Sequence, residues 1–256
     1  MKSYSAFSRL LKHAVAGVLL LLLFQACVHA PKVKKKPCND DPAPYQQALL
    51  NLSSKYKSLA GKVKVQVESR DGKVSFTGDL YAQSPGKLHF DIFGFLHRPR
   101  FILIKNGDSI AWKDFDSGRS YTGPLEACPG FPVKFPFSPS FLRDFMRILF
   151  LDFPGHVRVL PPEKGEEPCR FLMMCRWGIF DMTVDSSVGL PVLLEGPQGE
   201  SARFRLSYGN YAPVSSLVVP RRYGIAIRDV RMTFEFKTLK VNPPVSEKVF
   251  VPVIPR

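Results

Sequence analysis

The feature that most restricts the fold of this chain is an alternation of apolar and polar residues that begins at Val63. Val63, Val65 and Val67 are each separated by one polar residue, and the pattern resumes after the turn signal Asp71-Gly72. Side chains two residues apart lie on the same face of a β-strand. The alternation therefore predicts strands with one buried and one polar face, paired antiparallel through a short turn.

Turn signals recur along the chain and divide the rest of it into short segments of the same kind. They occur at 84–86, 106–107 and 116–118 in the first half, and at 185–189, 196–199 and 209–210 in the second. We expect a first meander of strands over 63–122. We expect a second one with strands near 170–177, 180–185, 192–195, 202–208, 223–227 and 231–241.

Two segments have a helical period instead. Apolar residues at 45, 48, 49, 52, 56 and 59 follow Asp41-Pro42, a plausible start signal, and predict an amphipathic helix over 43–59. A second helix is expected after Ser138-Pro139, between the two meanders. The fold class is therefore mainly β with helices (α+β). Composition does not change along the chain and no repeat is evident, so we expect one domain over residues 42–256.

The N-terminus has the order of a secretory signal. Lys2, Arg9 and Lys12 precede an apolar stretch over 14–24, and Ala26 stands directly before Cys27. The small residue and the cysteine resemble a bacterial lipoprotein signal, which implies cleavage before Cys27 and acylation of that residue. The alternative is an ordinary secretory signal or an uncleaved anchor. We expect a signal peptide over 1–26, a lipid-anchored tether over 27–41, and a mature protein outside the cytoplasm.

The chain is strongly basic, with a formal net charge of +14. Loss of the three basic residues of the signal leaves about +11. Because an exported lipoprotein rarely meets nucleic acid, anionic lipid head groups or an acidic partner are the expected counterparts. The run Lys32, Lys34, Lys35 and Lys36 either touches head groups or is a solvated linker.

Four cysteines remain after Cys27 is assigned to lipid: Cys38, Cys128, Cys169 and Cys175. In an oxidising compartment they allow three complete pairings. Cys169 and Cys175 are expected on one strand, about 20 Å apart at strand rise, and so should not pair with each other. The sequence has no metal-ligand spacing, and we expect neither a metal nor a cofactor.

Catalytic signatures are also absent from the sequence, so we expect no enzyme. Asp114 and Asp116 flank a turn, where Asp is favoured in any case. The meander and the second helix instead provide an apolar concavity of the kind that binds hydrophobic ligands. The alternative is a plain packed core. The residues we expect to line the cavity are Phe76, Leu80, Phe90, Ile92, Phe101, Phe141, Phe145 and Ile148.

Several stretches, taken in order, resemble the LolA/LolB family of lipoprotein carriers and receptors. They are Asp91–Leu96, Asp116–Thr122, Phe135-Pro136-Phe137 followed by Phe141-Leu142-Arg143, and Val219-Pro220-Arg221-Arg222. The resemblance extends over about residues 45–251. It implies a half-open antiparallel β-barrel with a helical lid, and an apolar cavity that holds the acyl chains of a lipoprotein in transit.

The resemblance to the LolB branch also implies a role at the outer membrane. It implies a monomer, lipid-anchored and facing the periplasm, that accepts cargo from a LolA-type periplasmic carrier and inserts it into outer-membrane lipid. The insertion loop of that branch matches Phe95 and Leu96 here, although this loop lacks the Pro before and the Gly after the leucine. The alternative is a sensory or envelope-assembly lipoprotein that binds lipid on the same fold without cargo transfer.

Overall fold

The computed structural model describes residues 38, 40–70, 72–131, 139–153, 155–161, 169–197 and 204–252. The first half contains α2 (Ala43–Lys55), β1 (Ser58–Ser69), β2 (Gly72–Gln83), β3 (Lys87–Phe93), η1 (Phe95–His97), β4 (Pro99–Asn106), β5 (Ser109–Asp114) and β6 (Ser120–Pro124). After α3 (Pro139–Phe150) come β7 (Arg158–Leu160), β8 (Arg170–Cys175), β9 (Gly178–Asp185), β10 (Leu190–Gly196) and β11 (Phe204–Gly209). The chain then forms β12 (Ala212–Val214), β13 (Leu217–Val219), β14 (Arg222–Ile227), β15 (Val230–Phe236), β16 (Lys240–Val241) and η2 (Glu247–Phe250).

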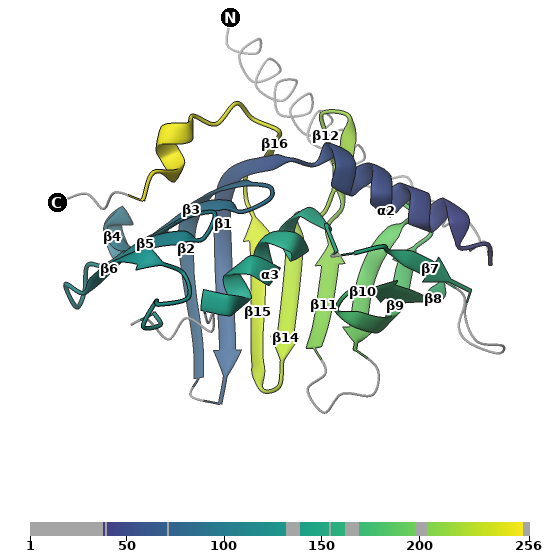
Figure 1. The fold of residues 1–256 in the computed structure, drawn as a ribbon, viewed down its shortest axis with the longest axis horizontal. Coiled ribbons are helices and arrows are strands. Elements are labelled where there is room, and N and C mark those ends of the chain that lie inside the picture. The colour runs from purple at the N-terminus through teal and green to yellow at the C-terminus, as the bar shows by residue number, and fades with distance from the viewer. Residues whose placement is uncertain are drawn as a thin grey trace, which may run out of the picture. The chain divides into compact units, whose positions relative to one another are not determined.

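The long strands form one antiparallel sheet whose two halves meet where β1 pairs with β15 (Figure 1). The order across the sheet is β6-β5-β4-β3-β2-β1-β15-β14-β11-β10-β9-β8-β7, and β16 also pairs with β1. Strands β6 and β7 stand at opposite ends of this order. The sheet is therefore not closed into a barrel, which confirms the expected antiparallel fold with an open side.

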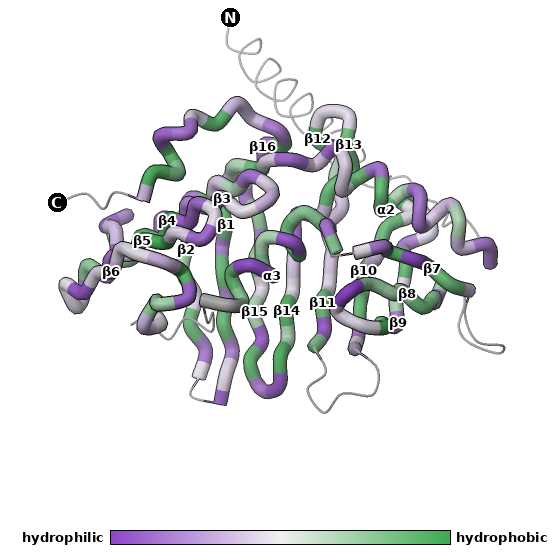
Figure 2. Tube along the Cα trace, viewed as in Figure 1, coloured by the Kyte–Doolittle hydropathy of each residue, from purple (hydrophilic) through white to green (hydrophobic). Residues whose placement is uncertain are grey.

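One face of the sheet, which we call the inner face, is apolar from strand to strand. A row of cross-strand partners on this face runs from β2 to β11: Phe76, Val65, Phe234, Tyr223 and Tyr208. All of these are buried except Phe76, which is half-buried. Figure 2 shows how hydrophobic and hydrophilic positions alternate along the strands. The period of two seen in the sequence thus becomes one buried face.

Both helices pack against the inner face. In α3 the ring of Phe145 lies 4.8 Å from that of Phe234 on β15, and in α2 the ring of Tyr45 lies 4.8 Å from that of Phe171 on β8. Phe171 belongs to a continuous row of partners that passes through Met182, Leu194, Leu206, Ile225 and Met232 to Val67. No helix in the described part of the chain is long and apolar enough to cross a membrane.

The first helix is shorter than the sequence predicts, because it ends at Lys55 rather than near residue 59. The Asn242 side chain accepts hydrogen bonds from the Lys57 and Ser58 amides, at 2.9 and 3.1 Å, and donates to the Lys55 carbonyl at 2.8 Å. These contacts take up backbone groups that a longer helix would use. The expected strand over 231–241 is interrupted at residues 237–239, where the Lys237 and Thr238 amides both donate to the Lys62 carbonyl, and it becomes β15 and β16.

Only one disulfide is present among the described cysteines, and it joins Cys38 to Cys169. It links the start of α2 to the start of β8. Cys128 and Cys175 are half-buried thiols, and Cys128 Sγ accepts a hydrogen bond of 3.4 Å from the Trp112 indole. The prediction that Cys169 does not pair with Cys175 is confirmed.

Candidate functional site

Helix α3 covers the centre of the inner face with an apolar side of its own. Its buried residues are Leu142, Phe145, Met146, Ile148, Leu149 and Phe150. They recur at the three- and four-residue spacing that places side chains on one side of a helix. Arg143 lies on the opposite, exposed side, 3.8 Å from Asp108 in an ion pair between two exposed side chains. The contact of α3 with the sheet is therefore mainly apolar.

The structure brings the eight expected lining residues into one hydrophobic cluster. Leu80, Phe90, Ile92 and Phe101 are buried on the inner face, Phe145 and Ile148 are buried in α3, and Phe76 and Phe141 are half-buried against the same cluster. The rings of Phe76 and Phe90 are 6.3 Å apart, and those of Phe141 and Phe145 are 6.4 Å apart. With α3 in this position, these side chains fill the space between helix and sheet.

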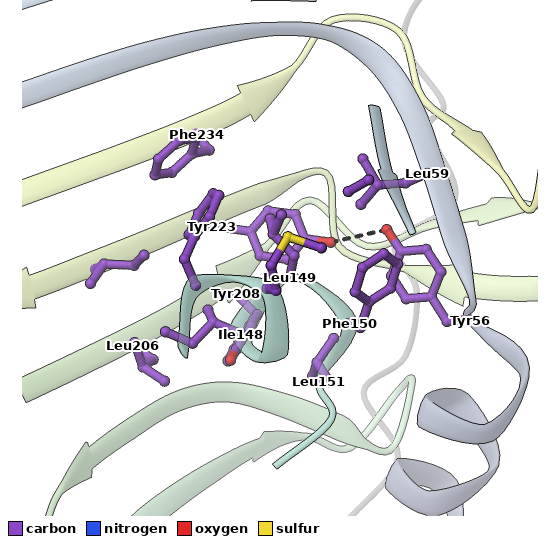
Figure 3. Packing of buried hydrophobic residues seen from close by; sticks show 14 of the residues in the cluster. Tyr56, Leu59, Ile148, Leu149, Phe150, Leu151, Leu206, Tyr208, Tyr223 and Phe234 are labelled. Carbon is purple, nitrogen blue, oxygen red and sulfur yellow. Dashed lines mark hydrogen bonds between the residues drawn. The ribbon is translucent and has the colours of Figure 1, made fainter. Parts of the chain in front are cut away.

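The second half of the sheet supplies contacts to α3 that the sequence analysis did not select. Figure 3 shows Leu206, Tyr208, Tyr223 and Phe234 around Ile148 and Leu149. All four are buried in the same cluster. They alternate along β11, β14 and β15 in the period of two that located the strands. That alternation could have identified them as inner-face residues, but not as neighbours of α3.

Among the tyrosines of this apolar cluster, Tyr56, Tyr208 and Tyr223 have fully buried hydroxyls. The hydroxyls of Tyr56 and Tyr223 are 3.4 Å apart and share a hydrogen bond (Figure 3). The hydroxyl of Tyr208 is buried and has no hydrogen-bond partner among the described residues. Burial raises the pKa of all three phenols far above the ordinary range. They are therefore neutral hydroxyl groups that can donate hydrogen bonds.

The loop between β3 and β4 exposes one large apolar residue. Leu96 is 72% exposed and has a positive φ of 56°. The side chain of Phe95 lies outside the described part of the structure, and the ring of His97 stacks on Phe93 at 4.1 Å. Leu96 thus does not fold back over the sheet.

The basic residues beside this loop are not equally available. Arg98 is exposed, whereas Arg100 Nε donates to Asp116 Oδ2 at 2.7 Å. Asp114 accepts from the Asp116 amide at 3.0 Å and from the Ser117 hydroxyl at 2.7 Å. The two carboxylates thus stabilise a turn and an ion pair. Among the described residues, no group of three or more His, Cys, Asp or Glu could hold a metal ion.

A hollow of about 720 Å³ lies on the outer face of the second half of the sheet. Its walls include two ion pairs, Arg205 with Glu195 at 3.3 Å and Arg170 with Asp181 at 3.7 Å. Small side chains such as Ser207 leave it open to solvent. Because its lining includes four arginines, one aspartate and one glutamate, it does not suit acyl chains. The apolar space that could receive them is the one that α3 fills.

Solved structures of other proteins have the same fold. A candidate outer membrane lipoprotein-sorting protein domain from Vibrio parahaemolyticus matches with a TM-score of 0.57 at 10% identity, covering 82% of this chain and 97% of that one. A LolA superfamily protein from Nitrosomonas europaea matches with a TM-score of 0.54 at 12% identity, covering 81% and 97%. A DUF1329 family protein from Desulfovibrio piger also matches at 0.54, with 9% identity, covering 82% and 96%.

No protein-family model and no curated protein matches the sequence. At such low identities the structural matches speak for the fold alone. They show that the chain has a LolA-like fold, as the resemblance in the sequence implied. Function has to be argued from the site, because one fold can serve several functions.

Proposed function

We propose that this protein binds the acyl chains of lipoproteins between α3 and the inner face, and helps to insert lipoproteins into the outer membrane. The observation that carries the proposal is the apolar contact of α3 with an open sheet. Six buried side chains hold the helix there, and Arg143 adds one exposed ion pair. A helix held in this way can be displaced by another apolar group of similar size.

The energies of such an exchange are balanced. Six large apolar side chains at about 1.5–3 kcal/mol each amount to about 9–18 kcal/mol of burial. A palmitoyl chain with about 14 methylenes at about 0.8 kcal/mol each offers about 11 kcal/mol. The two energies are of the same order, so an acyl chain can replace a large part of the apolar contacts of α3. This allows both uptake and release, which a deep permanent cavity would not.

The proposal includes a lipid anchor at Cys27, reached through the tether over 27–41, with the binding domain over 42–256. The lipoprotein signal supports it, and residues 1–37 lie outside the described part of the structure. A clickable fatty acid should label the wild type and not Cys27→Ser, and equal labelling would refute the anchor. Val28 replaces the Asp that would favour retention in the inner membrane, so outer-membrane fractions, facing the periplasm, should contain the protein.

The exposed loop supports a role in delivery. An apolar side chain that is 72% exposed is unfavourable in water and suits a membrane surface. Phe95 and Leu96 would enter the outer-membrane lipid, with Arg98 reaching the head groups. Arg100 contributes less than the sequence alone implies, because it is paired with Asp116.

Cargo transfer needs a donor, and we propose a LolA-type periplasmic carrier that meets this protein as a monomer. The reaction forms and breaks no covalent bond, so the protein acts without catalytic residues. The test is transfer of a fluorescent lipoprotein from such a carrier to outer-membrane vesicles containing the full-length protein. Transfer that depends on the protein supports the proposal.

The alternative is a lipid-binding sensory or envelope-assembly lipoprotein. It predicts that the protein takes up acyl chains but leaves the rate of delivery unchanged. Failure to take up any acyl chain would contradict both functions and favour a plain packed core.

A further inference from the structure

The buried hydroxyl of Tyr208 is the polar group of the inner face that the fold does not explain. Tyr208 is only 4% exposed, and its hydroxyl has no partner among the described residues. A buried hydroxyl without a hydrogen bond is destabilising, because it gives up its bonds to water and gains none in return. Phenylalanine would fill the same space without that cost. The structure with α3 in place therefore carries a donor for which it provides no acceptor.

The position of this donor matches the proposed acyl site. Tyr208 ends the row that runs through Tyr223, Phe234 and Val65 to Phe76. Figure 3 draws Tyr208 in the same buried cluster as Ile148 and Leu149 of α3. The row crosses five strands, which span about 19 Å at about 4.8 Å between neighbours. This is the length scale of an extended long-chain acyl group.

The two ends of the row differ in character. At the β2 end Phe76 is half-buried, and Val74 beside it is 46% exposed. At the β11 end Tyr208 is enclosed, and its neighbour Tyr223 already shares a hydrogen bond with Tyr56. A chain along the row would place its apolar tail near Phe76. Its polar end would then lie beside the Tyr208 hydroxyl, which has no partner among the described residues.

We propose that the Tyr208 hydroxyl donates a hydrogen bond to the carbonyl oxygen of a bound acyl group, once α3 has moved aside. This inference rests on the proposed function, and it adds the chemical group that the site recognises. A carbonyl is the acceptor that free fatty acids and ester-linked acyl chains have in common. Tyr208 thus selects acyl groups over plain hydrocarbon.

The test uses the full-length protein, anchored in nanodiscs of dioleoylphosphatidylcholine. The probes are photoreactive palmitic acid, its methyl ester, and hexadecane with the same diazirine position. Labelling of the domain by each probe is measured by mass spectrometry in wild type and in Tyr208→Phe. Comparing two variants with the same probe cancels the partition of that probe into the membrane.

We expect Tyr208→Phe to lower labelling by the acid and the ester about fivefold to tenfold, the effect of one hydrogen bond of about 1–1.4 kcal/mol. Labelling by hexadecane should not fall. The melting temperature should stay the same or rise, because the substitution removes an unpartnered buried hydroxyl. A fall for the acid alone would assign the site to free fatty acids, and a fall for both would extend it to ester-linked chains.

Tyr211→Phe is the matched control, because it also removes a tyrosine hydroxyl, but one that already has a hydrogen-bond partner. The Tyr211 hydroxyl donates to the Pro191 carbonyl at 2.5 Å. This variant should lose stability and keep the wild-type preference among the probes.

Two results would overturn the inference while leaving the proposed function intact. One is unchanged labelling by all three probes in Tyr208→Phe, and the other is an equal loss for all three, hexadecane included. Absence of labelling of the wild type by every probe would instead overturn the proposed function itself.

Discussion

Helices α2 and α3 cover the same face of the sheet, but they are held there in different ways. Near the start of α2 a disulfide joins Cys38 to Cys169, and within it the Gln46 side chain accepts a hydrogen bond of 3.1 Å from the Val159 amide. At its end Asn242 binds the Lys55 carbonyl. In α3 the described contacts are apolar side chains and the exposed ion pair between Arg143 and Asp108.

Because of this difference, α2 is a fixed cover of the inner face and α3 is a replaceable one. Hydrogen bonds and a disulfide have directional geometry, so a ligand that displaces α2 would have to supply specific partners. Apolar contacts are non-directional and scale with buried area. A hydrocarbon chain can therefore substitute for α3 without matching its shape in detail. We expect α3 to be the part that opens and α2 to remain in place.

The largest effect is expected from removing the central contact of α3. Phe145→Ala deletes a buried ring that lies 4.8 Å from Phe234, and it should lower the free energy of unfolding by about 3–5 kcal/mol. In the wild type we expect the α3 amides to exchange hydrogen faster than the α2 amides. Phe145→Ala should make this difference larger. Urea unfolding and exchange measured by mass spectrometry test both statements.

The matched change on the other helix is Leu52→Ala, which removes a buried side chain of α2. It should reduce global stability, by about 2–5 kcal/mol, without releasing α2 alone, since the disulfide and the hydrogen bonds remain. Equal protection of the α2 and α3 amides against hydrogen exchange in the wild-type protein would contradict the proposed difference between the two helices.

The next largest effect concerns the covalent link of α2. Replacing Cys38 and Cys169 together by Ser should cost about 2–4 kcal/mol, because the bridge closes a long loop of the unfolded chain. The α2 amides should then exchange about as fast as those of α3. The control replaces Cys128 and Cys175, which form no disulfide, by Ser. If replacing Cys128 and Cys175 lowers the free energy of unfolding as much as removing the disulfide does, the disulfide is not what fixes α2.

The disulfide and the hydrogen bonds of α2 also show what the sequence could and could not predict. The strands of both meanders and the start of α3 follow from alternation, helical spacing and turn residues, all of which are local. The partner of Cys38 and the capping of α2 by Asn242 join residues more than 130 positions apart. No spacing in the sequence specifies such pairs. The predicted end of the first helix was wrong for that reason.

Some residues of the candidate site could likewise be predicted from the sequence, and others could not. Phe145 and Ile148 were predicted because a helix has one apolar side, and Phe90 and Ile92 because a strand alternates. Tyr223 and Phe234 alternate just as clearly. The contact of Phe234 with Phe145 of α3 depends on the place of β15 in the sheet, beside β1. Which inner-face residues the helix crosses is a property of topology and not of any single segment.

A smaller effect is expected from the half-buried Asp144 of α3. Burial raises the pKa of its carboxyl, although Arg147 and Arg143 partly oppose this. A raised pKa in the folded state means that the protonated form favours folding. This stabilisation is complete below the ordinary pKa of 3.8 and is lost as the pH rises through the raised value. At neutral pH the carboxylate therefore loosens α3.

Asp144→Asn should tighten α3 at neutral pH by less than about 1 kcal/mol, and should slow its hydrogen exchange. The gain should shrink as the pH falls toward 3.8, because the wild-type carboxyl then becomes neutral as well. Exchange rates of α3 and α2 amides at several pH values measure this. A gain that grows on acidification, or that is equal in α2, would contradict the assignment to Asp144.

The smallest effect on stability, with a large one on delivery, is expected at the exposed loop. Leu96 is 72% exposed and contributes little to the core, so Leu96→Asp should change the free energy of unfolding by no more than about 0.5 kcal/mol. Uptake of acyl chains under α3 should be unchanged, because Leu96 lies outside the hydrophobic cluster. Delivery of a labelled lipoprotein to vesicles should slow, since a carboxylate does not enter the apolar part of a membrane.

Leu50 on α2 provides the control for this last prediction, because it is also a large exposed apolar residue, at 41%. Leu50→Asp makes the same chemical change on the fixed helix and should leave uptake and delivery as they are. If both variants slow delivery equally, surface hydrophobicity in general is responsible, and the loop is not a specific insertion device. If Leu96→Asp loses uptake instead, the loop belongs to the mechanism that moves α3, and opening and delivery are one step.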